Sequence, residues 1–156
     1  MPNKTEVDRE IDGQKLAEEV GRKMLFQDKA AQALGIKLLE IAPGFAKMSM
    51  LVREDMLNGF AICHGGMTFA LADTAFAYAC NSRNQRTVAL SCTITYAGPA
   101  HVGDTLVATA KEEALNNRTG LYDIVVTNQR NEKVAFFRGN SYSTKRPSYD
   151  GSGLPE

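Results

Sequence analysis

The chain has 156 residues, a length that fits one domain with a single hydrophobic core. Hydrophobic residues make up 44% and charged residues 23%, and 18 Lys and Arg balance 18 Asp and Glu. The near-zero net charge excludes a global electrostatic attraction to nucleic acid or to an anionic membrane, so any anion must be recognised locally.

The N-terminal part predicts a tail followed by one helix. Residues 1–14 are polar and are expected to form a flexible tail. From Lys15 to Leu34, apolar residues recur at helical spacing with charges between them, which predicts an amphipathic helix that stops at Gly35. A single domain is expected over residues 15–144.

At the other end of the chain, residues 145–156 are rich in Gly, Ser and Pro and are expected to form a second flexible tail.

Strands are predicted on both sides of a second, apolar helix. Residues 36–54 indicate two strands joined by a turn at Ala42-Pro43-Gly44. Residues 65–80 are dominated by Ala, Leu, Phe and Met, so this helix must be buried on more than one side. β-Branched and alternating segments then predict four more strands, at residues 87–98, 103–115, 119–129 and 132–143.

This order of elements predicts the fold class. Consecutive strands with short turns favour an antiparallel sheet. A curved sheet of about five or six strands wrapped around a long central helix buries that helix on several sides. The expected class is therefore α+β, with the architecture of the hotdog fold.

Two glycines, Gly65 and Gly66, begin the apolar helix. Glycine lets a ligand approach the free N–H groups of the first helical turn. Those donors, together with the positive end of the helix dipole, suit a carbonyl oxygen that becomes anionic during acyl transfer. Many helices start in this way without such a role, so an ordinary helix start remains open.

Asp73 is the only charged residue between His64 and Arg83. An ionised carboxylate among apolar neighbours costs several kcal/mol unless it is paired or hydrogen-bonded, and such residues are often used for chemistry. The alternative is that Asp73 points to solvent or bonds to a local hydroxyl such as that of Thr74. The residues alone leave both interpretations open.

The spacing of Gly65 and Asp73 has a geometric consequence. Eight residues of helix separate them by about 12 Å along the axis and by roughly 80° around it. One helix therefore cannot bring both groups to the same carbon atom. Two antiparallel helices across a two-fold axis can pair Gly65 of one chain with Asp73 of the other, which predicts at least a homodimer.

Other residues of the helix offer competing interpretations. A thiol at a helix start can have a lowered pKa, so Cys63 with His64 is a possible nucleophile and base, although a free cysteine is more often a small buried apolar residue. His64 is interpreted as a hydrogen-bonding residue that orients the loop, and His101 as an exposed turn residue. The rings of Phe69, Phe76 and Tyr78 belong to the core or line a pocket.

The cysteine pattern and the N-terminus predict a cytoplasmic protein. Cys63, Cys80 and Cys92 form an odd set without a CxxC pair, which fits free thiols in a reducing compartment. No stretch approaches the about 18 apolar residues that cross a bilayer, and the first residues lack the apolar segment of a signal peptide. No metal site is indicated.

Several motifs occur in the order typical of one family. They are ALGI (33–36), MLNG (56–59), CHGG (63–66), LADTAFAYACNS (71–82), SCTITY (91–96), GDTL (103–106) and FFRGNS (136–141). Together they cover most of residues 25–143. In these motifs the sequence resembles the hotdog thioesterases of the phenylacetate degradation pathway, within the 4-hydroxybenzoyl-CoA thioesterase-like superfamily.

The resemblance implies hydrolysis of an acyl-CoA thioester, with phenylacetyl-CoA and its ring-hydroxylated relatives as substrates, in a homotetramer built from dimers. It places Asp73 on the family's catalytic acid and Gly65 on the N–H that polarises the thioester carbonyl. Asn58, His64 and Thr74 fall on supporting positions. It leaves open whether the carboxylate attacks directly or activates water, and no cofactor is needed because coenzyme A belongs to the substrate.

Substrate contacts are assigned to Gly66 and Phe76, and contacts to the CoA phosphates to Arg83 and Arg138. Two other functions remain open. One is a hotdog dehydratase or lyase for hydroxyacyl thioesters, which normally needs a histidine paired with a carboxylate. The other is a non-catalytic acyl-CoA-binding protein that keeps the fold.

Overall fold

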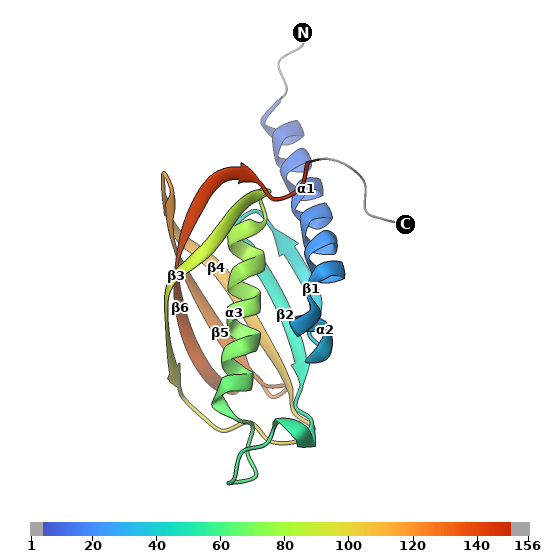
Figure 1. Ribbon diagram of the computed structural model, residues 1–156, viewed down its shortest axis with the longest axis vertical. Coiled ribbons are helices and arrows are strands. Elements are labelled where there is room, and N and C mark those ends of the chain that lie inside the picture. The colour runs from blue at the N-terminus through green and yellow to red at the C-terminus, as the bar shows by residue number, and fades with distance from the viewer. Residues whose placement is uncertain (1–4, 151–156) are drawn as a thin grey trace.

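The computed structural model describes residues 5–150. Within them the chain forms an α+β hotdog fold, in which a six-stranded antiparallel sheet curves around a central helix (Figure 1). This confirms the predicted fold class. The elements are, in chain order, α1 (Glu6–Gln27), α2 (Lys29–Ala33), β1 (Lys37–Ala42), β2 (Phe45–Leu51), the 3-10 turn η1 (Glu54–Met56), α3 (Gly65–Asn81), β3 (Gln85–Tyr96), β4 (Thr105–Asn116), β5 (Thr119–Thr127) and β6 (Lys133–Pro147).

The sheet has the order β1-β2-β4-β5-β6-β3, and all neighbouring strands are antiparallel. β3 pairs with β6, the last strand of the chain, and not with β4, which follows it in sequence. β3 therefore lies at one edge of the sheet, and β1 lies at the other. β3 also carries the large exposed side chains Val88 and Leu90.

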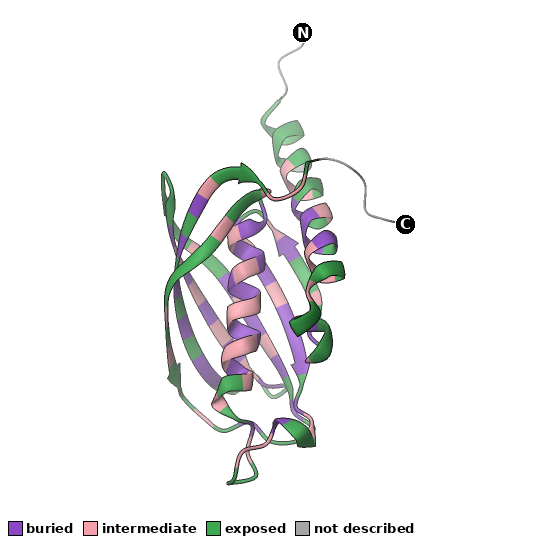
Figure 2. Ribbon diagram, in the orientation of Figure 1, coloured by how far each residue is buried: buried purple, intermediate pink, exposed green. Residues whose placement is uncertain are grey.

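The central helix α3 lies in the concave face of the sheet, with buried residues along most of its length (Figure 2). The ring of Phe76 packs between Tyr122 and Phe137, with ring centroids 5.5 and 6.0 Å away. On β6, Gly139 allows this approach, because a Cβ there would lie 2.7 Å from the Phe76 ring. The apolar character of the helix is thus explained by burial against the sheet.

The N-terminal helix begins earlier than expected. Thr5 and Asp8 form a capping box, in which the Asp8 N–H donates to Thr5 Oγ1 at 3.1 Å and the Thr5 N–H donates to Asp8 Oδ2 at 3.1 Å. Residues 6–14 therefore lie in α1 and not in a tail. The expected helix over 15–34 is also divided, because Asp28 ends α1 and its side chain caps α2 by accepting from the Ala31 N–H.

The last strand is longer than predicted. β6 continues past residue 144 to Pro147, because its end pairs with the start of β3 at Thr87↔Ser143 and Gln85↔Pro147. The remaining parts of the two predicted tails, residues 1–4 and 151–156, lie outside the described residues. Across residues 5–150, no helix has the length and apolar character that crossing a membrane requires.

Candidate active site

The loop before α3 is held by Asn58. Its Oδ1 accepts the N–H of Phe60 at 2.9 Å, and its own N–H donates to the Ile62 carbonyl at 2.8 Å. Leu57 and Cys63 form a β-bridge that closes the base of the loop. Within the protomer the Asn58 side chain therefore supports the loop and does not contact Asp73.

The start of α3 leaves one backbone donor free. His64 is the N-cap, and its Nδ1 accepts the N–H of Gly66 at 2.9 Å, which requires the tautomer with Nδ1 unprotonated. The His64 carbonyl accepts from the Met67 N–H at 2.9 Å. Among the described residues the Gly65 N–H has no hydrogen-bond acceptor. It is the donor that the helix start can offer to a ligand.

A cavity of about 440 Å³ adjoins this donor. It is lined by the loop before α3, by the end of β3 and by the segment that follows β3. Tyr96 contributes its ring and donates its hydroxyl to the Gly65 carbonyl at 2.7 Å. The lining residues that bear on the site are Asn58, Cys63, Gly65, Thr68 and Tyr96.

Asp73 lies two turns further along α3, on a half-buried face of the helix. Burial raises the pKa of its carboxyl, and a hydrogen bond from the Cys92 thiol, with Sγ 3.9 Å from Asp73 Oδ1, partly offsets this rise. Thr74 does not stabilise the carboxylate, because its hydroxyl donates to the Ala70 carbonyl at 2.6 Å. The bond between Asp73 and the Thr74 hydroxyl that the sequence left open is therefore absent within the protomer, and Cys92 on β3 takes that place.

The two halves of the candidate site are thus separated within one chain. Gly65 is the first residue of α3, and Asp73 follows eight positions later on the same helix. The axial rise over eight residues is about 12 Å, longer than an Asp side chain. One protomer therefore presents the free N–H and the carboxylate as separate features.

The alternative in which Cys63 is a nucleophile and His64 its base loses support in the structure. Cys63 is 7% exposed, and burial raises its thiol pKa, which opposes formation of a nucleophilic thiolate. Its Sγ lies 3.8 Å from Thr68 Oγ1 and does not contact an imidazole nitrogen in the described contacts. His101 is exposed in the turn before β4, as expected. No cluster of three or more metal-ligating side chains occurs among residues 5–150.

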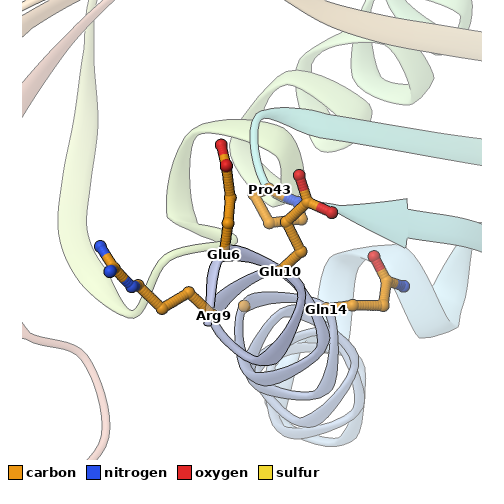
Figure 3. A pocket seen from close by; sticks show the side chains of 6 residues that line it. Glu6, Arg9, Glu10, Gln14 and Pro43 are labelled. Atoms are coloured by element: carbon orange, nitrogen blue, oxygen red, sulfur yellow. The ribbon is translucent and has the colours of Figure 1, made fainter. Parts of the chain in front are cut away.

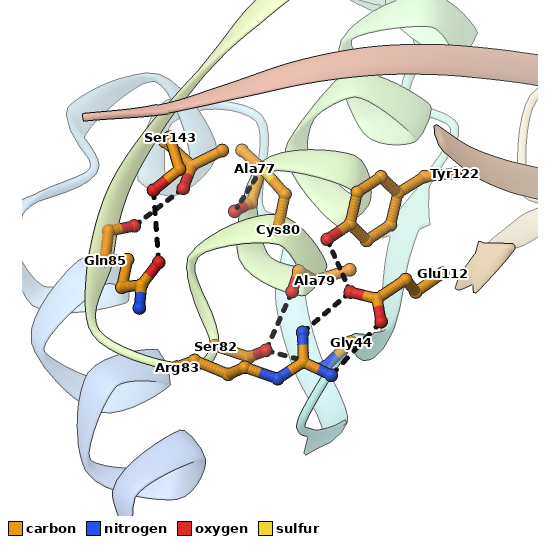
Figure 4. Close-up of polar contacts among 11 residues, drawn as sticks. Gly44, Ala77, Ala79, Cys80, Ser82, Arg83, Gln85, Glu112, Tyr122 and Ser143 are labelled. Atoms are coloured by element: carbon orange, nitrogen blue, oxygen red, sulfur yellow. Dashed lines mark hydrogen bonds and ion pairs between the residues drawn. The ribbon is translucent and has the colours of Figure 1, made fainter. Parts of the chain in front are cut away.

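The two arginines assigned to CoA are engaged in ion pairs. Arg83 follows the far end of α3 and donates to Glu112 at 2.6 and 3.2 Å, and Glu112 also accepts the Tyr122 hydroxyl at 2.7 Å (Figure 4). Arg138 on β6 pairs with Asp123 on β5 at 2.6 and 2.7 Å. Neither arginine is brought next to Gly65 in one protomer, so their contact with CoA stays a prediction.

The remaining assigned residues divide between core and helix start. Phe76 is 1% exposed in the core, so its packing favours a structural role over the expected substrate contact. Phe69 is half-buried and packs edge-on against Phe137, with centroids 5.2 Å apart. Gly66 lies exposed at the start of α3, although its N–H is bound by His64.

A second cavity lies beside α1, at the opposite end of the molecule from the Gly65 loop (Figure 3). It measures about 610 Å³ and contains none of the residues that the sequence assigned to a site. Glu6 and Glu10 give it an acidic character, which disfavours the phosphates of a CoA ester. Its lining residues are Glu6, Arg9, Glu10, Gly13, Gln14 and Pro43.

Tyr96 and Cys92 are site residues that the sequence analysis did not select. Cys92, Ile94 and Tyr96 alternate along β3, so they share one face of the strand. That periodicity was the available signal for their approach to α3. The pairing of β3 with β6, which fixes its position, was not evident from the sequence.

Comparisons with known proteins agree with this fold. Residues 60–135 match the thioesterase superfamily. The acyl-coenzyme A thioesterase PaaI of Escherichia coli is 50% identical over 119 residues, which span 76% of this chain and 85% of that protein. A solved structure of the E. coli PaaI protein, from the phenylacetic acid degradation operon, matches with a TM-score of 0.84 and 45% identity over 86% of this chain and 97% of that one.

A crystal structure of a Streptococcus mutans protein bound to acetyl CoA is more distant. It is 25% identical, with a TM-score of 0.70 over 72% of this chain and 91% of that chain. The similarity to PaaI spans most of both proteins and includes the loop before α3, the Asp73 helix and the edge strand. The chain therefore belongs to the thioesterase superfamily, and it is an enzyme of the same type as the acyl-coenzyme A thioesterase PaaI.

Proposed function

We propose that this enzyme hydrolyses aryl-acyl-CoA thioesters, such as phenylacetyl-CoA or hydroxyphenylacetyl-CoA, to the free acid and CoA. Asp73 acts as nucleophile or general base, and the Gly65 N–H stabilises the oxyanion. The observation that carries the proposal is a pair of polar groups on α3, a free N–H at its start and, two turns later, a half-buried carboxylate that accepts only the weak hydrogen bond of the Cys92 thiol among the described residues. The aryl preference is supported by the phenylacetic acid operon of the E. coli relative.

The chemistry needs only these groups and water. In the general-base route, Asp73 takes a proton from water while the water oxygen bonds to the thioester carbon. The carbonyl oxygen becomes an oxyanion and accepts the Gly65 N–H. The C–S bond then breaks, the acid is released, and the CoA thiolate takes up the proton. In the nucleophilic route, Asp73 first forms a mixed anhydride, which water cleaves in a second step.

The catalytic site is completed by a second copy of the chain. The about 12 Å between Gly65 and Asp73 excludes their joint action from one helix. The free edge of β3 offers the contact surface, because an edge strand has backbone groups open to pairing. Val88 and Leu90 on the same strand are 52% and 60% exposed in the protomer and add apolar area beside that edge. An isologous dimer through this edge creates two composite sites, and pairs of such dimers form the expected tetramer.

Coenzyme A is the proposed carrier of the acyl group. Support comes from the name of the E. coli relative and from the acetyl CoA bound in the S. mutans structure. Arg83 and Arg138 remain the proposed contacts to its phosphates. If they serve this role, Arg83→Ala raises KM for phenylacetyl-CoA but leaves KM unchanged for a short N-acetylcysteamine thioester, which lacks the phosphates.

Two observations weigh against the other functions. The dehydratase reaction normally needs a histidine paired with a carboxylate, whereas His64 is the N-cap of α3 and Asp73 follows nine residues later, too far along the same helix for the two side chains to pair within one chain. A purely binding protein gains nothing from a half-buried carboxylate whose pKa is raised by burial. We propose a cytoplasmic location on the basis of the three free cysteines.

The first experiment follows thiol release from phenylacetyl-CoA. Wild-type protein is expected to release CoA, and Asp73→Asn to lose nearly all of this activity. The matched control is Asp8→Asn, an exposed carboxylate in the first turn of α1 that contacts none of the residues assigned to the site. Full activity in Asp73→Asn would refute the assigned role of Asp73.

A mixed-dimer experiment tests the composite site. One chain carries Asp73→Asn and the other carries Gly65→Pro together with Tyr96→Ala, and the two are co-expressed with different tags. Proline has no N–H and fits the first helical position, and removal of the Tyr96 ring makes room for its Cβ. A heterodimer then keeps one intact site, made from Gly65 of one chain and Asp73 of the other. Random pairing should restore about one quarter of wild-type activity. If both groups act from the same chain, the mixture stays inactive.

A further inference from the structure

We infer that Tyr96 is a positioning residue for the thioesterase reaction, because its hydroxyl clamps the Gly65–Gly66 peptide and so fixes the Gly65 N–H toward the cavity. The inference rests on the proposed role of that N–H as the oxyanion donor. It concerns a side chain on β3 that acts through the backbone of α3, without contacting the reacting atoms.

The clamp holds one peptide group at both of its polar ends. The Tyr96 hydroxyl donates to the Gly65 carbonyl at 2.7 Å, a short and well-formed O–H···O bond. The N–H of the same peptide, which belongs to Gly66, donates to His64 Nδ1 at 2.9 Å. Because a peptide group is planar, bonds at both ends prevent its rotation.

The neighbouring peptide group is held on one side only. Its carbonyl, from His64, accepts the Met67 N–H at 2.9 Å as part of the first helical turn. Its N–H belongs to Gly65 and is the free donor. Three of the four polar groups in these two peptides are thus bound, and the fourth is left in a fixed direction beside the cavity that Tyr96 also lines.

Steric contact adds to the hydrogen bond. A Cβ at position 65 would lie 2.9 Å from both Cζ and Oη of Tyr96, closer than side-chain carbons normally approach. A side chain at position 65 would therefore displace the Tyr96 ring and its hydroxyl, whereas glycine leaves both in place and keeps the helix start open to a ligand. Burial also raises the pKa of the Tyr96 phenol, so the hydroxyl remains a proton donor across the working pH range.

The bond contributes little to stability, which separates a positioning role from a structural one. Tyr96 is 51% exposed in the protomer, so water can bond to the Gly65 carbonyl once the Tyr96 hydroxyl is removed. The net stability gain of such an exchangeable hydrogen bond is small. A change that removes only the hydroxyl should therefore affect turnover without affecting the thermal midpoint.

The test is Tyr96→Phe, which keeps the ring and removes the hydroxyl. Complete loss of an oxyanion donor costs about 10²–10³ in kcat, and a misoriented donor costs less, so we expect kcat to fall about 5- to 30-fold. KM and the thermal midpoint should stay near wild type. The control is Tyr142→Phe on β6, half-exposed beside Arg118, for which kinetics should not change.

A double-mutant cycle tests the steric part. Gly65→Ala should lower kcat in the wild-type background, because its methyl group pushes against the Tyr96 ring. In a Tyr96→Ala background the space is open, so Gly65→Ala should add little further loss. Equal losses in both backgrounds would contradict the interlock between the two residues.

Backbone spectra give a readout independent of activity. In protein labelled with ¹⁵N-glycine, Tyr96→Phe should shift the Gly65 and Gly66 amide signals and speed exchange of the Gly66 amide. Unchanged glycine signals, a wild-type kcat, or an effect on KM alone would overturn the positioning role of Tyr96. These outcomes differ from failure of the proposed function, which would appear as an Asp73→Asn enzyme that still releases CoA.

Discussion

The contact between Phe76 and Gly139 sets how closely α3 approaches the sheet, and Gly139→Ala tests it. The added Cβ would lie 2.7–2.8 Å from three atoms of the Phe76 ring, whereas favourable carbon contacts are about 3.5–4.0 Å. The ring cannot retreat easily, because Tyr122 and Phe137 enclose it. The helix or β6 must therefore move by several tenths of an ångström or more.

The expected size follows from two opposing effects. Overpacking of this kind costs about 1–3 kcal/mol, and the loss of glycine freedom in the unfolded chain returns about 0.4–1 kcal/mol. We expect a net destabilisation of about 1–2 kcal/mol, equivalent to a fall in the thermal midpoint of about 2–8 °C. Turnover should also fall, because Asp73 lies one helical turn before Phe76.

Urea unfolding at a fixed protomer concentration measures this effect, since stability depends on concentration if the protein unfolds from an oligomer. The control is Gly59→Ala, where a Cβ meets no atom within 4 Å and stability should not change. In a Phe76→Leu background, Gly139→Ala should cost at least about 1 kcal/mol less than in wild type. Additive losses would refute the steric account of α3 packing.

Three further predictions follow from the charged and polar groups. Burial raises the pKa of Asp73, so its ionised form destabilises the fold, and Asp73→Asn should raise the thermal midpoint at pH 7 to 8. Melting curves should show that this gain vanishes below the unfolded pKa of about 3.9. A lower midpoint for the variant at pH 7 would contradict the prediction. Cys92→Ala removes the thiol that donates to Asp73, so the acid limb of the pH profile of kcat/KM should move to higher pH. The control is Cys80→Ala, which should leave the acid limb in place because the Cys80 thiol donates to the Ala77 carbonyl. Glu112→Ala leaves the buried Tyr122 hydroxyl without its acceptor and should cost about 1–3 kcal/mol in urea unfolding, a loss that Tyr122→Phe should partly recover.

The hotdog architecture was predictable because its elements have strong local signals. The Pro43-Gly44 turn separates β1 from β2, and the apolar run after Gly66 indicates a helix buried on several sides. The start of α1 was missed because its first residues are exposed and carry no apolar repeat. Its signal was instead the capping box of Thr5 and Asp8.

The geometry of the candidate site was predictable only where its residues lie on one segment. Gly65, His64 and Asp73 share α3 or its cap, so their relation follows from helix geometry. Tyr96 and Cys92 reach the site from β3, whose place beside β6 depends on long-range pairing that no local pattern specifies. Thr74 illustrates a further ambiguity, because a mid-helix hydroxyl can bond to the carbonyl four residues earlier, as it does with Ala70.

The position of α1 has a practical consequence. It packs along β1, at the sheet edge opposite β3, and its first residues lie at the far end of the molecule from the Gly65 loop (Figure 1). A tether joined ahead of α1 should thus leave the Gly65 loop of the same chain and the β3 edge unobstructed. The enzyme is accordingly suited to surface immobilisation or fusion through this end.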